Sequence, residues 1–205
     1  MPRARWFVCG VVLLAAFAVL GLIVARQPLA LDARIANALR GEDIRPVGQV
    51  AGVLTDVLGP VLPFVMGAVL LALAIRRPGD RALCVRLAVV LVLCRLTSLV
   101  GKPVFVRERP RVYPDLSYPS GHVVSVASTG LVAVLLCAWL VPRVLRWAVA
   151  AAVVATVLAA ACRIVLGVHW LTDTVGAVLA VTGVGLLSAA GLDLLPAPRE
   201  RSLDG

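Results

Sequence analysis

Long apolar runs alternate with short polar segments along this chain, and the charged residues gather at the ends of the runs. A run of about 20 apolar residues with few charges is typical of a helix that spans a membrane. The pattern predicts spans at six places: residues 6–25, 50–75, 82–101, 122–141, 147–166 and 170–195. We therefore expect an all-α protein, a six-transmembrane-helix bundle that forms a single integral-membrane domain over residues 1–205.

The segment between the first two spans carries a weaker, helical pattern. Leu31, Ile35 and Leu39 recur every four residues, and Gly41 follows as a helix stop. Polar residues occupy the other faces: Asp32, Arg34, Asn37 and Arg40. The pattern predicts a short amphipathic interfacial helix that lies on the outer membrane surface.

Composition supports the membrane assignment. Hydrophobic residues make up 61% of the 205 residues, against about 45–50% in a soluble domain. The net charge of +9 would suggest nucleic acid as the partner of a soluble protein. Here the cations sit mostly at helix ends and in loops, where membrane topology and anionic lipid explain them better. We expect a membrane bilayer, and no nucleic acid, as partner.

The chain has only two histidines, and each lies beside residues suited to binding a phosphate. His169 and Asp173 are four residues apart, so on a helix they share one face. Asp173 would then accept a hydrogen bond from one ring nitrogen and leave the other free as a nucleophile. Because six residues separate Arg163 from His169, we expect Gly167 to break the helix so that both face one pocket. A structural histidine near the interface is the alternative.

The second histidine lies in Pro119-Ser120-Gly121-His122, at the start of the fourth span. Gly121 allows close approach of the backbone to a ligand, and the free N–H groups of a helix N-terminus favour an anion. Ser120 adds a hydroxyl donor, and His122 could protonate a leaving group and then deprotonate water. The alternative is an ordinary turn with a helix cap.

Lys102 and Arg109 follow the third span, in a stretch with prolines at positions 103, 110 and 114. They could be an ordinary basic loop, or, with Arg163, a clamp whose charges stabilise a phosphoryl group. The chain shows neither a carboxylate cluster for magnesium nor a His/Cys cluster for zinc. We therefore expect a mechanism without metal or other cofactor.

Three motifs occur in order: Lys102-x6-Arg109-Pro110, Pro119-Ser120-Gly121-His122 and Arg163-x5-His169-x3-Asp173. Together they resemble the signature of the type 2 phosphatidic acid phosphatase superfamily, which includes vanadium haloperoxidases and bacterial acid phosphatases. The resemblance implies that His169 attacks phosphorus to form a phosphohistidine, that Asp173 orients it, and that His122 protonates the leaving group. It implies these phosphate ligands: Lys102, Arg109, Ser120, Gly121 and Arg163.

One position departs from that family's pattern. The third motif usually begins with serine, and here Cys162 precedes Arg163. Because a thiol donates hydrogen bonds weakly, one phosphate contact is lost or is replaced by the backbone or by Ser117.

The function expected from these motifs is that of a metal-independent membrane lipid phosphatase. Its substrate would be a lipid phosphomonoester or diphosphate: a prenyl diphosphate such as undecaprenyl diphosphate, phosphatidic acid or phosphatidylglycerol phosphate. A vanadate-dependent haloperoxidase is disfavoured by the six spans. A non-enzymatic anion or lipid transporter is disfavoured by the plain Ala/Val/Leu composition of the spans. The oligomeric state is left open.

Charged loops predict the orientation in the membrane. The two predicted sides carry equal numbers of cations, with Arg199 and Arg201 on the side of the termini. If Lys102, Arg109 and Arg163 are functional, the tie breaks and the Arg76–Arg81 loop faces the cytoplasm. We then expect both termini in the cytoplasm and the site on the extracytoplasmic face of the cell (plasma) membrane. This requires that the first span is retained rather than cleaved as a signal peptide.

Two charges within the spans are not part of the motifs. At 1.5 Å per residue, Asp56 and Arg95 both lie about 10 Å below the outer boundary. Charges in lipid usually pair or face the protein interior. The hypothesis is an Asp56–Arg95 ion pair, and the alternative is that Arg95 snorkels or reaches backbone carbonyls.

Overall fold

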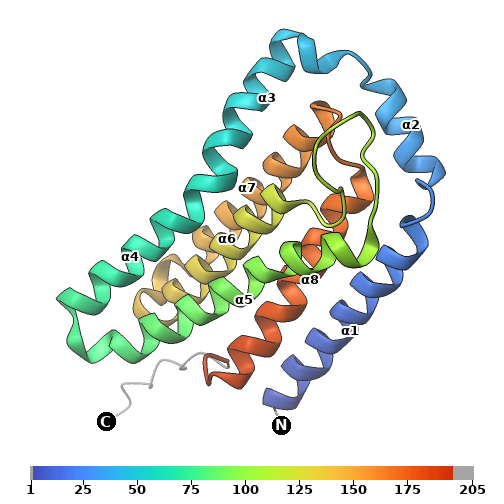
Figure 1. The fold of residues 1–205 in the computed structure, drawn as a ribbon. Coiled ribbons are helices and arrows are strands. Elements are labelled where there is room, and N and C mark those ends of the chain that lie inside the picture. The colour runs from blue at the N-terminus through green and yellow to red at the C-terminus, as the bar shows by residue number, and fades with distance from the viewer. Residues whose placement is uncertain (1, 196–205) are drawn as a thin grey trace.

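The computed structural model describes residues 2–195, which form helices and loops without any strand (Figure 1). Helices long and apolar enough to cross a membrane occur at six places: Arg3–Val24, Pro46–Arg76, Pro78–Phe105, Gly121–Leu140, Pro142–Val165 and Leu171–Gly191. Each predicted span coincides with one of them to within a few residues. The prediction of an all-α integral membrane protein with six spans is confirmed. Arg199 and Arg201, assigned above to the cytoplasmic side, lie outside the described residues.

The helical elements follow one another with short connections. The α-helices are α1 (Pro2–Val24), α2 (Ala30–Ala38), α3 (Pro46–Asp56), α4 (Leu62–Arg76), α5 (Arg81–Phe105), α6 (Gly121–Leu140), α7 (Leu145–Val165) and α8 (Leu171–Gly191). Single turns of 3-10 helix precede α3, α5 and α7, at Glu42–Ile44, Pro78–Asp80 and Pro142–Val144.

The second span consists of two helices joined by a wider turn. A π-helical turn, η2 (Val57–Val61), connects α3 to α4 and contains Pro60. Proline lacks the N–H that an α-helical turn would use there, so the local widening has an identifiable cause. The widened turn faces α6.

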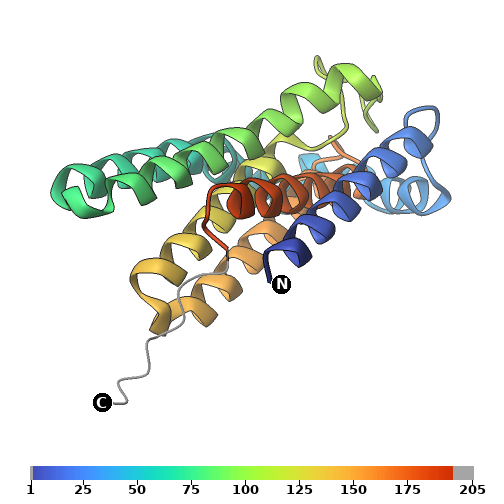
Figure 2. The ribbon, with the colours of Figure 1, turned by 90° about the horizontal axis from the view of Figure 1, so that it is seen from below.

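Helix α8 lies at the centre of the bundle and packs against α1, α5 and α6 (Figure 2). Its buried residues are mostly small, such as Ala177 and Ala189, and they share one core cluster with Leu87, Cys94 and Val124 from α5 and α6. Small residues let helix backbones approach closely, which is how helices associate in lipid. The other faces expose large apolar side chains, for example Phe64 at 80% exposure, as lipid-facing surfaces do.

The loop between α5 and α6 is anchored to α1 by an aromatic cluster. Tyr118 is fully buried and stacks on Phe17, with ring centroids 5.2 Å apart, and Phe105 meets it edge-on at 5.1 Å. The Tyr118 hydroxyl donates to the carbonyl oxygen of Phe17 at 2.7 Å. Both ends of the loop are therefore packed against α1.

The predicted helix exists as α2, and of its apolar stripe Ile35 and Leu39 are partly buried while Leu31 is exposed. Leu31 is 57% exposed, whereas Asp32, assigned above to a polar face, is 1% exposed. The reason is that the Asp32 carboxylate accepts hydrogen bonds from Arg107 and from Thr172 at the start of α8. A buried polar contact at Asp32 therefore holds α2 against the bundle in addition to its partly buried apolar residues.

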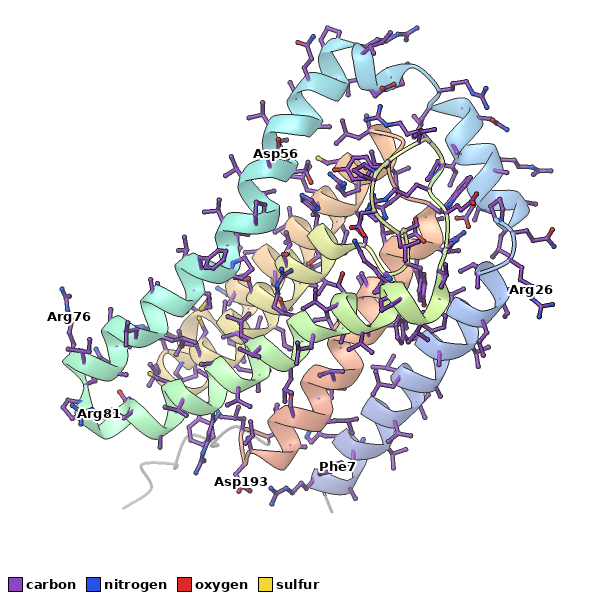
Figure 3. The ribbon with its side chains drawn as sticks, in the orientation of Figure 1. Phe7, Arg26, Asp56, Arg76, Arg81 and Asp193 are labelled. Atoms are coloured by element: carbon purple, nitrogen blue, oxygen red, sulfur yellow. The ribbon has the colours of Figure 1, made fainter. Side chains whose placement is uncertain are left out.

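The two ends of the bundle differ in content. The start of α1, the end of α8 and the α4–α5 turn share one end, where Figure 3 labels Phe7, Asp193, Arg76 and Arg81. At this end Arg3 of α1 forms an ion pair with Asp193, which follows α8, at 2.6 Å. The α5–α6 loop lies at the opposite end. Which end faces the cytoplasm stays a prediction.

Helix α8 packs so closely on the α5–α6 loop that one of its glycines leaves no room for a larger side chain. A Cβ atom at Gly176 would overlap the buried Tyr118 ring, which the surrounding aromatic cluster prevents from moving aside. Overpacking of this kind typically costs about 1–3 kcal/mol. Gly176→Ala should therefore lower the apparent melting temperature in detergent by several degrees.

The matched control is Gly52→Ala in α3, where an added Cβ meets nothing within 4 Å. Alanine favours a helix over glycine by about 1 kcal/mol, so this variant should melt no lower than the unmodified protein. Equal melting temperatures for the two variants would contradict the packing described here.

Candidate active site

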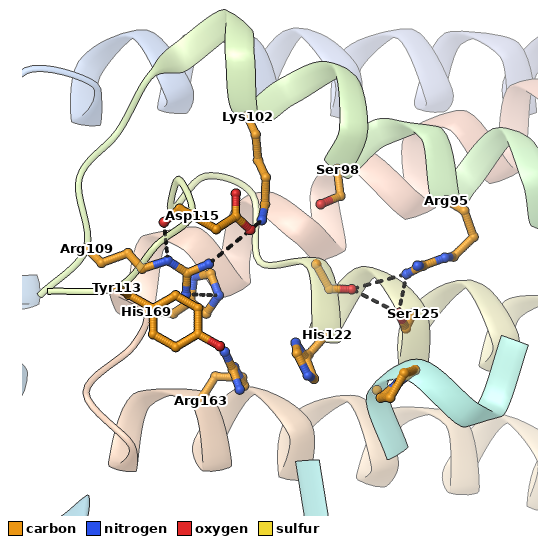
Figure 4. Close-up of a pocket in the computed structure, with 13 residues that line it drawn as sticks. Arg95, Ser98, Lys102, Arg109, Tyr113, Asp115, His122, Ser125, Arg163 and His169 are labelled. Atoms are coloured by element: carbon orange, nitrogen blue, oxygen red, sulfur yellow. Dashed lines mark hydrogen bonds and ion pairs between the residues drawn. The ribbon is translucent and has the colours of Figure 1, made fainter. Parts of the chain in front are cut away.

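A pocket of about 260 Å³ opens at the loop end of the bundle (Figure 4). Its walls come from α5, the α5–α6 loop, the start of α6, the end of α7, the α7–α8 connection and the π-helical turn. The lining residues are Gly59, Pro60, Arg95, Ser98, Lys102, Arg109, Tyr113, Asp115, Gly121, His122, Ser125, Arg163 and His169. Residues of all three sequence motifs thus meet in one cavity.

The chain breaks between α7 and α8 where the sequence predicted. Helix α7 ends at Val165, and Gly167 adopts φ +64°, a left-handed conformation that suits glycine. Arg163 and His169 consequently both reach the pocket. Without this break, their six-residue separation would direct them to different faces.

His169 contacts Asp173 as expected, but not from a helix. The Nδ1 atom of His169 lies 3.2 Å from Oδ2 of Asp173, although His169 precedes Trp170, the N-cap of α8. Asp173 is the third residue of α8, and its Oδ2 accepts the backbone N–H of Trp170 at 2.8 Å. A carboxylate at this position caps the first turn and reaches the residues just before the helix.

Asp173 is fully buried, and its charge is compensated. Its Oδ1 lies 2.5 Å from Nη1 of Arg107, and the Ser117 hydroxyl donates to Oδ2. A carboxylate with these partners stays ionised, so the His169 Nδ1–H donates to it. The lone pair of the His169 Nε2 then faces away from Asp173.

Burial lowers the pKa of His169 to about 4, although the hydrogen bond and charge of Asp173 act in the opposite direction. The imidazole is therefore neutral at pH 7. Its Nε2 lies 3.0 Å from Nη1 of Arg109, which donates to it. A neutral ring whose Nε2 lone pair points into the pocket, once Arg109 releases it, is the nucleophilic form of histidine.

Arg109 also holds the α5–α6 loop in shape. Its guanidinium donates to the carbonyl oxygens of Asp115 at 2.6 Å, Val168 at 2.7 Å and Leu116 at 3.1 Å. The group lies 4.3 Å from the ring centroid of Tyr113. One side chain thus connects the loop to the backbone beside His169.

Lys102 lies in the last turn of α5 and not beyond it, since the helix continues through Pro103 to Phe105. Its ammonium contacts the carboxylate of Asp115, which also lies 3.4 Å from Arg109. Burial alone would raise the pKa of Asp115, but the hydrogen bond and charge of Lys102 hold that pKa below its ordinary value. An ionised carboxylate therefore bridges two cations of the pocket.

The second motif forms the opposite wall. His122 is the second residue of α6, and Gly59 of the π-helical turn packs so closely on its ring that a Cβ there would overlap it. Ser120 is the N-cap of α6, but it is fully buried behind the pocket wall. Within the described residues, Ser120 Oγ and Arg163 Nε have no hydrogen-bond partner.

Ser117 does not replace the hydrogen-bond donor that a serine would supply at the position of Cys162. Cys162 is 5% exposed and lies outside the pocket lining. The Ser117 hydroxyl, considered above as a substitute donor, is committed to Asp173. A phosphate in this pocket would depend on the cations and on backbone N–H groups.

Arg107 was missed by the sequence reasoning. It is 2% exposed and pairs with both Asp32, at 2.8 Å, and Asp173. In the sequence it stands among other cations of an apparently basic loop, and nothing local distinguishes it. Asp115 was also missed, since its contacts with Lys102 and Arg109 depend on the path of the loop.

The hypothesis of an Asp56–Arg95 ion pair is wrong, and the alternative is confirmed. Nη1 of Arg95 donates to the carbonyl oxygen of Gly121 at 3.2 Å and contacts the Ser125 hydroxyl. Among the described residues, no carboxylate oxygen lies within 4.0 Å of Arg95. Equal depth in the membrane does not bring two helices into contact on the required face.

The fold and the pocket together agree with a known family. Residues 81–193 match the model of the PAP2 superfamily, which is more than half of the chain, and the chain therefore belongs to that superfamily. A similar solved structure is described as the first transmembrane PAP2 type phosphatidylglycerolphosphate phosphatase from Bacillus subtilis. Its TM-score is 0.72 at 21% identity, covering 93% of this chain and 98% of that chain, which shows a shared fold. No curated protein matches the chain by sequence.

Asp115 should compete with anions for the pocket, because its carboxylate contacts the same two cations that a phosphate would use. Asp115→Asn removes this competing charge. We expect orthophosphate to bind roughly two- to fivefold more tightly to the variant, the range for a partly exposed ion pair. Isothermal titration at pH 7 would measure it.

Glu108→Gln is the matched control, since it removes the same charge from an exposed position of the same loop. Its affinity for orthophosphate should stay close to that of the unmodified protein. A gain as large as that of Asp115→Asn would attribute the effect to net charge alone.

Proposed function

We propose that this protein is a metal-independent membrane lipid phosphatase that acts through a phosphohistidine. The observation that carries the proposal is a neutral His169, fixed by Asp173, in a pocket that also holds Lys102, Arg109 and His122. Membership of the PAP2 superfamily supports the same chemistry.

Binding of substrate begins with an exchange of anions. The substrate phosphate takes the place of the Asp115 carboxylate between Lys102 and Arg109. Arg109 then turns its Nη1 from the His169 Nε2 to a phosphate oxygen, which frees the Nε2 lone pair. Arg163, whose Nε has no partner within the described residues, supplies a third cation.

The chemical step follows from the positions of the two histidines. Nε2 of His169 attacks phosphorus, the bond to the leaving oxygen breaks, and His122 donates a proton to that oxygen. Asp173 stabilises the positive charge that develops on the His169 ring. The cations stabilise the negative charge shared by the phosphoryl oxygens, which is usually the largest contribution in phosphoryl transfer.

The second half of the reaction reverses the roles. His122, now neutral, takes a proton from water as the oxygen attacks phosphorus. The N–P bond of the phosphohistidine breaks, and orthophosphate leaves. His122 is protonated again, and His169 returns to its neutral form.

A lipid substrate fits a pocket between membrane-spanning helices, because its tail stays in the bilayer while its phosphate reaches the polar end. We propose that this end is extracytoplasmic and that both termini lie in the cytoplasm. Prenyl diphosphates, phosphatidic acid and phosphatidylglycerol phosphate remain the candidates. The similar Bacillus subtilis protein is named for the last of these.

Replacement of the nucleophile tests the mechanism. His169→Ala should reduce phosphate release from these lipids by detergent-solubilised protein by about 10³-fold or more, since the covalent step has no substitute. The assay is run with EDTA, and unmodified protein should keep its activity there. Circular dichroism confirms that the variant is folded. Full activity in the variant would sink the mechanism, and loss of wild-type activity in EDTA would sink metal independence.

The environment of His169 predicts its titration. Burial lowers its pKa to about 4, below the ordinary value near 6.5, so the ring should stay neutral on acidification to pH 5. The chain has two histidines, so a His122→Asn variant with ¹⁵N-labelled histidine shows His169 alone. Its ¹⁵N chemical shifts should report an Nδ1–H tautomer and a midpoint near pH 4. A midpoint near pH 6.5 would contradict the burial described here.

A further inference from the structure

Arg95 is the one residue of the pocket lining whose cation the proposed mechanism does not use. It projects from α5 into the pocket, seven residues before Lys102 on the same helix face. In Figure 4 His122 lies between Arg95 and the group formed by Arg109, Arg163 and His169. The pocket thus has cations on both sides of His122.

The charge of Arg95 has no counterion among the described residues. Nη1 is its only nitrogen with a hydrogen-bond partner there, and both partners are neutral. Arg95 is half-buried within a membrane span. A cation at such a depth is costly unless an anion compensates it, and charged residues inside spans usually mark functional sites.

Support of the α6 N-terminus does not by itself explain Arg95. The carbonyl oxygen of Gly121 already accepts a hydrogen bond from the Ser125 hydroxyl at 3.0 Å. That contact lies within α6 and would persist without Arg95. The guanidinium keeps Nε and Nη2 for another acceptor.

The in-line geometry of the proposed reaction predicts which part of a substrate reaches Arg95. In an in-line displacement the leaving oxygen lies opposite the nucleophile. His169 is the proposed nucleophile and His122 the proposed acid, so the leaving oxygen lies at His122. The atoms beyond that oxygen extend past His122, toward Arg95.

We propose that Arg95 binds a second phosphate on the leaving part of the lipid, and that the enzyme prefers lipids with two phosphate groups to lipid phosphomonoesters. This inference rests on the proposed function. The second phosphate is either bonded directly to the first, as in a prenyl diphosphate, or separated by a glycerol, as in phosphatidylglycerol phosphate. In both substrates the second phosphate carries one negative charge shared by two non-bridging oxygens, which the forked donors of a guanidinium can bind.

With a diphosphate the step is balanced as follows. Nε2 of His169 bonds to the terminal phosphorus, and the bond from that phosphorus to the bridging oxygen breaks. The electron pair stays on the bridging oxygen, which takes the proton of His122. The product is a lipid monophosphate held by Arg95, and water releases orthophosphate from His169.

The experiment compares farnesyl diphosphate with farnesyl monophosphate. Because the scissile bond is a phosphoanhydride in the first and a phosphoester in the second, the change of their kcat/KM ratio between variants reports on Arg95. The unmodified enzyme should show the higher kcat/KM for the diphosphate. Arg95→Gln should lower the diphosphate-to-monophosphate ratio by about 10- to 100-fold, the worth of a charge-assisted hydrogen bond. Arg95→Lys keeps the charge and should retain part of the preference.

The matched control is Arg86→Gln, which removes an exposed arginine from the same helix and should leave the ratio unchanged. The same ratio is measured in parallel for phosphatidylglycerol phosphate and phosphatidic acid. The comparison shows whether Arg95 binds a second phosphate bonded directly to the first or one separated from it by a glycerol.

The outcomes are distinct. A wild-type preference for the monophosphate, or an equal loss on both substrates in Arg95→Gln, would overturn the role of Arg95 while leaving the phosphatase function intact. Hydrolysis of none of the four lipids by the unmodified protein would overturn both. If Arg95→Gln does not fold, the change of the ratio in Arg95→Lys still decides.

Discussion

The two ion pairs of the buried Arg107 guanidinium are the interactions on which the rest of the site depends. Arg107 pairs with Asp32 of α2 and Asp173 of α8, and all three side chains are almost fully buried. Loss of one partner from such a network typically costs about 3–5 kcal/mol, because the remaining charge stays buried without compensation. Through Thr172, which donates to Asp32, the same network fixes the start of α8. The orientation of His169 follows from Asp173, and so from Arg107.

The groups that shape the pocket are also the groups that would react in it. Arg109 holds the α5–α6 loop by its carbonyl oxygens and donates to the His169 Nε2. Asp115 neutralises Lys102 where a phosphate would bind. A folded pocket with clustered cations needs such internal partners, since uncompensated cations repel. In the proposed mechanism a substrate phosphate would replace contacts that already exist, so that binding would be an exchange of similar anions.

Much of the fold and of the candidate site could be predicted from the sequence. Hydrophobic run length located the six spans, and Gly167 correctly marked the break that brings Arg163 and His169 together. Predictions failed where a long-range partner decides. Asp32 looked like a solvent-facing residue of an amphipathic helix, and Arg107 looked like one of several loop cations. Their pairing joins residues 75 positions apart, and no local periodicity records such a contact.

The sequence by itself determined the number of spans and the order of the motifs, because both are encoded locally by run length and spacing. Only the tertiary structure decided which charges meet. In the structure Arg95 donates to the Gly121 carbonyl oxygen and does not pair with Asp56. Asp115 pairs with Lys102, and the Ser117 hydroxyl donates to Asp173. The physical reason is that a charge in a low-dielectric bundle takes the partner that helix rotation and loop path place within reach, and those are set by the packing of the whole bundle.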